Sequence, residues 1–310
     1  MNRPTTQAAT VNTVPTPEGV RLDFLWLELT NRCNLYCVHC YTQSSPQSGD
    51  RDKLDVQDYV SIMQEAFALA CRSIQFIGGE PQLGREFPTL LAEATRIGFP
   101  FIEVFTNLTF LPEDTLRYAE INGIRFATSV YSDDAATHDA ITRVRGSHAK
   151  TIDNLRRLIG AGVATRAGVI RVNQSGTEMD QTRKFLLDLG VPHVRSSDVR
   201  EFGRGEEVLG REAQMTGLCG HCWNGKLCVA PDGEVFPCVM ARKWPVGNIR
   251  QTDLAGIVNG MPLRRIRREI YESTWLREGV QACPQSEPGC PQSCWPGEVC
   301  FPNIIRCEPA

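Results

Sequence analysis

The placement of cysteine constrains the fold of this chain more than any other feature of its sequence. The 310 residues include 13 cysteines, and nine of them lie between Cys219 and Cys307. The last 28 residues hold five cysteines and six prolines but few apolar side chains, so they cannot bury enough surface to fold unaided. Either disulfides or bound metal must therefore stabilise this region. The odd cysteine count, and a Thr- and Pro-rich segment 1–19 without a secretory signal, favour metal.

Composition and charge argue against two classes of partner. The formal net charge is −3, which gives no reason to expect nucleic acid. No stretch approaches the ~18–20 apolar residues of a membrane span. The one basic cluster is expected to form the solvated face of an amphipathic helix, and it comprises Arg264, Arg265, Arg267 and Arg268. We therefore expect a cytoplasmic protein that binds neither nucleic acid nor membrane.

The region from about Leu22 to Arg200 alternates short apolar segments with helical patterns. The apolar segments are continuous and contain Val, Ile and Phe, as buried parallel strands do. Strands that alternate with helices imply right-handed crossovers and a parallel sheet. The sequence therefore predicts an α/β fold, either an open sheet or a partial barrel. The six expected strands are 24–29, 73–77, 101–105, 124–130, 165–172 and 193–197.

Local signals mark two of the intervening helices. Asp55 can cap the N-terminus of the helix that begins after it, and Asp58 follows three residues on. Pro88 can begin the next helix and Gly98 can end it.

Three cysteines follow the first expected strand in the spacing C-x3-C-x2-C, at Cys33, Cys37 and Cys40. Three thiolates in one short loop could bind three irons of a four-iron cluster and leave the fourth iron open. A structural zinc site would need a fourth protein ligand, and His39, the local candidate, is awkwardly placed between two ligands. A position at the carboxyl end of a strand favours a functional site over a structural one.

The loop 30–40 resembles the signature of the radical S-adenosylmethionine (radical SAM) superfamily, and the resemblance extends over about 24–200. It implies an enzyme that cleaves S-adenosylmethionine reductively at a [4Fe–4S] cluster. The resulting 5′-deoxyadenosyl radical would abstract hydrogen from a substrate. The expected fold is then a partial (β/α)6 TIM-like barrel over residues 22–203, with a flexible N-terminal tail at 1–21 and a cysteine-rich auxiliary-cluster domain at 204–310.

The second expected strand ends in Gly78-Gly79-Glu80. Glycines allow a ligand to approach the backbone, and a carboxylate can accept a hydrogen bond from an ammonium group. Alone, these residues describe only a turn. The resemblance implies that Glu80 holds the amino group of S-adenosylmethionine.

Polar residues also follow the later strands, and each could either bind the cofactor or cap its strand. Thr106 and Asn107 end the third strand, Ser129 ends the fourth, and Val172 lies at the end of the fifth. The resemblance implies a serine at the fourth strand and a following arginine, for which Arg143 or Arg145 is the candidate. No catalytic residue is assigned.

The C-terminal region contains a hairpin signal, Asp232-Gly233, between two cysteine-containing segments. This pattern resembles the auxiliary-cluster extension called the SPASM domain. By analogy, Cys222, Cys228 and Cys238 would share a [4Fe–4S] cluster with a later cysteine, and either one or two auxiliary clusters are possible. Cys71 is excluded as a small core residue, and zinc at the paired cysteines is the alternative. The expected auxiliary ligands are Cys219, Cys222, Cys228, Cys238, Cys283, Cys290, Cys294, Cys300 and Cys307.

The resemblance favours a maturase that forms a cross-link, epimerises a residue or oxidises a side chain in a ribosomally made peptide. Two alternatives remain: a radical dehydrogenase of a small molecule such as an amino sugar, and a non-catalytic zinc- or cluster-binding protein. The expected partners are a precursor peptide or small-molecule substrate and an electron donor such as ferredoxin or flavodoxin. The segment before the first strand is too short for a folded peptide-recognition domain, so a separate leader-binding protein is also expected.

Overall fold

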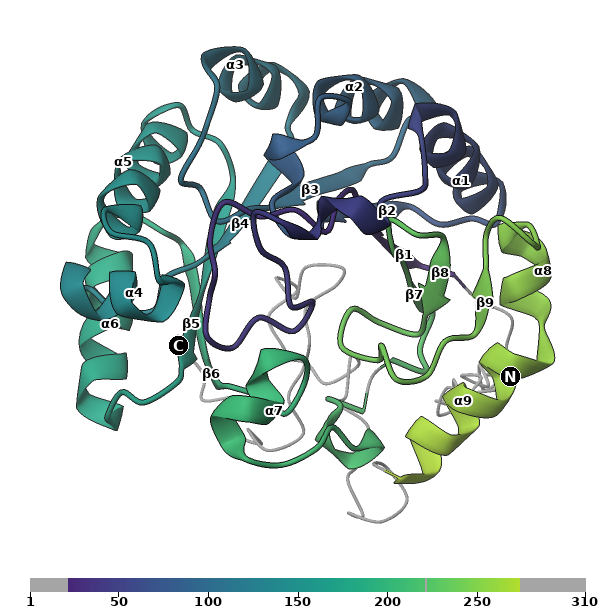
Figure 1. Cartoon of the computed structure of the whole chain (residues 1–310). Coiled ribbons are helices and arrows are strands. Elements are labelled where there is room, and N and C mark those ends of the chain that lie inside the picture. Colours follow the sequence, from purple (N-terminus) through teal and green to yellow (C-terminus); the bar gives the residue numbers. More distant parts are fainter. Residues whose placement is uncertain (1–21, 221, 274–310) are drawn as a thin grey trace, which may run out of the picture.

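Six parallel strands form a curved wall in the computed structural model, which describes residues 22–220 and 222–273. Each strand pairs with its sequence neighbour, so the order follows the chain, and the wall is the predicted partial barrel (Figure 1). The strands are β1 (Phe24–Glu28), β2 (Ser73–Ile77), β3 (Phe101–Phe105), β4 (Arg125–Ser129), β5 (Thr165–Arg171) and β6 (His193–Asp198).

Helices cover the outer face of this wall, as right-handed crossovers require (Figure 1). They are α1 (Val56–Ala68), α2 (Phe87–Ile97), α3 (Glu113–Asn122), α4 (Ala135–Thr142), α5 (Ser147–Gly160) and α6 (Gly176–Asp188). Asp55 and Asp58 form the expected capping box of α1, and Gly98 ends α2 in a left-handed conformation. Short 3-10 helices lie at η1 (Ser48–Arg51), η2 (Pro81–Leu83) and η3 (Met215–Gly217).

The cysteine-rich region continues the sheet of the barrel. After α7 (Arg204–Leu209), strand β7 (Lys226–Val229) pairs in parallel with β1, so that Cys228 lies opposite Trp26. The predicted hairpin is confirmed: β8 (Glu234–Phe236) runs antiparallel to β7 across the Asp-Gly turn, and β9 (Gly247–Asn248) follows. Two helices complete the described chain, α8 (Leu254–Asn259) and α9 (Met261–Tyr271).

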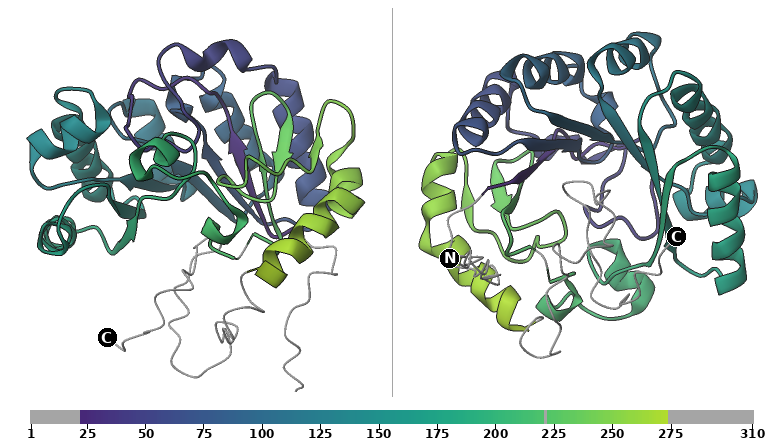
Figure 2. Two further views of the ribbon diagram at one scale, coloured as in Figure 1. Left: turned by 60° about the horizontal axis from the view of Figure 1, so that its bottom comes forward. Right: turned by 180° about the vertical axis from the view of Figure 1, so that it is seen from behind.

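Helices α8 and α9 pack beside the unit formed by β1 and α1, as Figure 2 shows from behind. The backbone N–H of Leu254 at the start of α8 donates to the Glu65 carboxylate of α1 at 2.6 Å. The basic cluster on α9 is exposed except at Arg267, which is buried, so the prediction of a solvated face is wrong for that residue. Arg267 lies on the same helix face as Leu263 and Ile270, which pack into the core.

No helix among the described residues combines the length and the apolar character needed to cross a bilayer.

The core position of Cys71 yields a prediction. Its thiol is fully buried near the start of β2 and donates to the Ser73 carbonyl at 3.3 Å, far from the other described cysteines in sequence. We expect Cys71→Ala to destabilise the fold by about 1 kcal/mol, as a typical core truncation does, while the iron content after anaerobic reconstitution stays unchanged. Loss of iron in this variant would contradict the assignment of Cys71 as a packing residue.

Candidate active site

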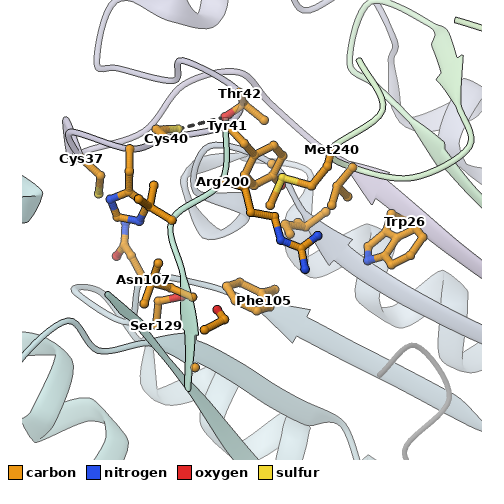
Figure 3. A pocket seen from close by; sticks show the side chains of 18 of the residues that line it. Trp26, Cys37, Cys40, Tyr41, Thr42, Phe105, Asn107, Ser129, Arg200 and Met240 are labelled. Atoms are coloured by element: carbon orange, nitrogen blue, oxygen red, sulfur yellow. Dashed lines mark hydrogen bonds between the residues drawn. The ribbon is translucent and has the colours of Figure 1, made fainter. Parts of the chain in front are cut away.

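A cavity of about 350 Å³ inside the barrel brings together the two groups of cysteines. Figure 3 shows it from close by, with Cys37 and Cys40 of the first group. Cys33, Cys37 and Cys40 line it from the loop after β1. A second trio lines it from the C-terminal region: Cys219, Cys222 and Cys238. The other sequence-predicted residues on its wall are Gly78, Gly79, Thr106, Asn107 and Ser129. Glu80, Arg143, Val172 and Cys228 are not among its lining residues.

Backbone hydrogen bonds hold the loop that carries the first three cysteines. The N–H of Cys33 donates to the Ser45 carbonyl at 3.0 Å, and the N–H of Tyr36 donates to the Thr142 carbonyl at the same distance. The Asp52 carboxylate accepts hydrogen bonds from the Thr30 hydroxyl and the Asn31 backbone N–H at the start of the loop. These hydrogen bonds hold the backbone that carries the three sulfurs.

The two glycines after β2 allow this loop to approach. The N–H of Gly79 donates to the Thr30 carbonyl at 2.8 Å, and a Cβ at Gly79 would lie 2.3 Å from the Arg32 carbonyl oxygen. Gly78 has a φ of +142°, and a Cβ there would lie 2.6 Å from the Thr30 carbonyl oxygen. The sequence suggested that these glycines make room for a ligand. The structure shows a more immediate reason, because the cysteine loop itself occupies that room.

Glu80 is fully buried and binds the end of β3. Its carboxylate accepts hydrogen bonds from the Thr106 hydroxyl at 2.7 Å and from the Asn107 backbone N–H at 2.8 Å. Burial raises the pKa of Glu80 to about 7, although these hydrogen bonds favour the carboxylate and oppose the shift. Glu80 thus positions two of the other predicted site residues. Its contact with the amino group of a cofactor stays a prediction.

Side chains at the ends of β3 and β4 contact the sulfurs of the loop. The Asn107 amide donates to Asn34 at 2.8 Å and lies 3.7 Å from the Cys33 sulfur. Tyr131, just after β4, lies beside the Cys37 thiol and the Ser129 side chain. Asn107 therefore contacts a sulfur of the loop and lines the cavity together with Ser129.

The structure places two predicted cofactor residues outside the cavity wall. Arg143 ends α4 with a φ of +57°, and its guanidinium lies 5.4 Å from the ring centre of Tyr36 in the cysteine loop. The backbone N–H of Val172 donates to the Gln174 side chain at 2.6 Å. In this conformation neither residue faces the cavity. The wall near β5 is formed instead by Gly168 and Ile170.

The chemistry of the thiols fits an iron–sulfur cluster. Burial raises the pKa of Cys33 and raises that of Cys37 to about 12, so both are protonated unless metal replaces the proton. Among the described residues, no three Cys, His, Asp or Glu side chains converge as they would around a single metal ion. In a four-iron cluster each cysteine binds a different iron, so the sulfurs are spread apart. Three thiols that open onto one cavity match that donor set.

The second cysteine group is closely packed. The sulfurs of Cys222 and Cys238 are 2.8 Å apart, and Cys219 lies beside Cys222. Cys228 lies instead beside the buried carboxylate of Glu28, and burial together with this negative charge raises the pKa of its thiol. The remaining predicted ligands lie outside the described residues: Cys283, Cys290, Cys294, Cys300 and Cys307.

Sequence reasoning missed several residues that the fold brings to the cavity. Trp26, Arg200 and Met240 line the part of the cavity away from Cys37 and Cys40 (Figure 3). They come from β1, from the segment after β6 and from the segment after β8. No spacing in the sequence links three positions so far apart.

Comparisons with known proteins agree with this geometry. The family model of the radical SAM superfamily matches residues 27–186, and that of an iron-sulfur cluster-binding domain, SPASM, matches 219–294. The antilisterial bacteriocin subtilosin biosynthesis protein AlbA of Bacillus subtilis is 23% identical over 75% of this chain, which spans only 58% of AlbA. The PqqA peptide cyclase of Xanthomonas campestris is 24% identical over 89% of this chain and 82% of its own length.

Solved structures share the fold. The crystal structure of Streptococcus suis SuiB bound to S-adenosylmethionine matches 80% of this chain and 68% of SuiB, with a TM-score of 0.65 and 16% identity. SuiB bound to its precursor peptide SuiA matches 79% of this chain and 66% of SuiB, with a TM-score of 0.64 and 15% identity.

The close approach at Gly79 predicts the effect of one added methyl group. We expect Gly79→Ala to displace the cysteine loop and to lower iron incorporation at that loop by more than about 10-fold, the lower end of the effect of disturbing a metal site's supporting contacts. Gly84→Ala is the matched control, because its Cβ would lie an ordinary 3.4 Å from the Pro81 carbonyl oxygen. Iron analysis of both variants tests this, and equal iron contents would contradict it.

Proposed function

Because this chain belongs to the radical SAM superfamily, we propose that it is a peptide-modifying enzyme that removes a hydrogen atom from a ribosomally made precursor peptide. The observation that carries the proposal is the single cavity lined by both cysteine groups. It would place a substrate between the site of radical formation and an auxiliary cluster.

Cys33, Cys37 and Cys40 would hold the [4Fe–4S] cluster, with one iron left open toward the cavity. When bound and reduced, this cluster supplies the electron that cleaves S-adenosylmethionine and so produces the radical that abstracts hydrogen. The backbone of Gly78 and Gly79 borders the same space and would lie along the methionine part of the cofactor.

The walls of the cavity would protect the radical. Leu35, Ile77, Ile170, Leu218 and Val239 give part of the wall an apolar lining, whereas hydroxyl groups line other parts of the same cavity. The apolar part would keep bulk water away from the radical. Tyr131 and His39 also line the cavity, and their rings pack edge to face with centres 4.9 Å apart. Burial lowers the pKa of His39 to about 4, so it is neutral near pH 7.

The choice of a peptide substrate is supported by the relatives. AlbA acts in subtilosin biosynthesis, the Xanthomonas relative is a PqqA peptide cyclase, and SuiB was solved with a precursor peptide.

We also propose a cytoplasmic setting and a ferredoxin- or flavodoxin-type electron donor, because a low-potential cluster needs a reducing partner. The domain limits 22–203 and 204–310 belong to the same proposal, although β7 and β1 share one sheet.

Removal of the three loop cysteines tests the first half of the function. We expect Cys33→Ala/Cys37→Ala/Cys40→Ala to lower 5′-deoxyadenosine formation by more than about 100-fold, since loss of outer partners alone costs 10–100-fold in metal sites. Chromatography of anaerobic, dithionite-reduced reactions measures the product. Cys71→Ala is the control and should retain wild-type activity. Product formation by the triple variant would refute the assignment.

The auxiliary group is tested separately. We expect Cys222→Ala/Cys238→Ala to lose about four irons per chain and to lose peptide modification, while it still cleaves S-adenosylmethionine. Mass spectrometry of the small peptides encoded beside the gene reports the modification. If the wild-type enzyme cleaves its cofactor but alters none of these peptides, the peptide proposal fails.

A further inference from the structure

Arg204 connects the end of the barrel to the cysteine loop near its beginning. Its Nε donates to the Cys37 carbonyl at 2.8 Å, and its Nη2 donates to the Ser44 carbonyl at 2.8 Å. Its own backbone N–H donates to the Cys40 carbonyl at 3.0 Å. One residue thus fixes the backbone at two of the three cysteines, from a position 167 residues beyond Cys37.

The flanking glycines allow this approach. Gly203 has a φ of +56°, and a Cβ there would lie 2.4 Å from the Tyr41 carbonyl oxygen. A Cβ at Gly205 would lie 2.0 Å from the Arg200 carbonyl oxygen. Gly203 therefore permits close contact with the backbone of the cysteine loop, and Gly205 permits the tight turn of its own segment, so that the arginine side chain between them reaches the loop.

The charge of Arg204 points to an anionic ligand. The residue is only 7% exposed, and its guanidinium lies over the Tyr36 ring, 4.4 Å from the ring centre. Its partners among the described residues are carbonyl oxygens and this ring rather than carboxylates. A buried cation is costly unless a negative charge lies nearby. Thiolates at Cys37 and Cys40 that bind a cluster would supply that charge.

We propose that Arg204 is a positioning residue for the cluster held by Cys33, Cys37 and Cys40, and that its charge sets the reduction potential of that cluster. The proposal rests on the function proposed above. Reduction adds an electron to an already anionic site, so a fixed positive charge beside it favours the reduced state. Loss of the charge should make the cluster harder to reduce.

Two variants separate the charge from the hydrogen bonds. Arg204→Gln removes the charge. Arg204→Lys keeps the charge, but its amino group cannot reproduce the planar guanidinium that donates to two carbonyl oxygens. Arg211→Gln is the matched control, because Arg211 is exposed and pairs with Glu201 at the surface. Circular dichroism of each protein before reconstitution reports whether the fold is retained.

The readout is an electron paramagnetic resonance redox titration of the reconstituted proteins with and without S-adenosylmethionine. The signal of Cys33→Ala/Cys37→Ala/Cys40→Ala is subtracted to isolate the loop cluster. We expect the ratio of reduced to oxidised cluster in Arg204→Gln to fall about 10-fold at a fixed potential, equal to about 59 mV for one electron. Arg204→Lys should restore the potential at lower cluster occupancy, and Arg211→Gln should match the wild type.

Different failures have different meanings. A folded Arg204→Gln protein with the wild-type potential and the wild-type spectral response to S-adenosylmethionine would overturn the role of Arg204 alone. A variant that has lost its fold before reconstitution would show a purely structural role and would also overturn it. A wild-type protein that binds no cluster at the loop would refute the proposed function itself.

Discussion

The site depends on close contact between the backbone of the cysteine loop and two other segments. After β2, the two glycines lie against Thr30 and Arg32, and after β6, Gly203 lies against Tyr41. Side chains other than hydrogen at these points would overlap carbonyl oxygens. The segments after β2 and after β6 therefore hold the loop on two sides, and its sulfurs face the cavity between the strands. Each thiol is buried or half-buried, so the arrangement favours metal-bound thiolates over free ones.

Much of the barrel was predictable because its signals are local. The bounds of β2 and β3 agree with the segments predicted from their Ile, Val and Phe residues, although each strand also carries a buried polar residue, and the caps at Asp55 and Gly98 follow from single residues. The three-cysteine loop could also be recognised from the sequence, since all three predicted ligands lie within eight residues. The Asp-Gly hairpin between β7 and β8 was predicted for the same reason. In each case the physical cause lies within a few residues of its effect.

The remaining features depend on contacts between distant segments. The pairing of β7 with β1 joins residues about 200 positions apart. The four residues of β7 carry no sequence pattern that would indicate this partner strand. Arg204 binds the loop because the last barrel strand ends beside it, which spacing alone does not reveal. Arg143 was chosen by its place after β4, but α4 ends there and directs it toward Tyr36. Arg267 was assigned to a solvated face together with its neighbours in sequence, but it lies on the helix face that packs inward.

In the proposed site, three sulfurs hold a four-iron cluster with one iron left for S-adenosylmethionine. Mössbauer spectroscopy of the Cys222→Ala/Cys238→Ala variant, reconstituted with ⁵⁷Fe, can detect that single iron. We expect S-adenosylmethionine to alter one iron site per loop cluster and to leave the other three unchanged. A spectrum that does not respond to S-adenosylmethionine, or a protein that binds no four-iron cluster at the loop, would contradict it.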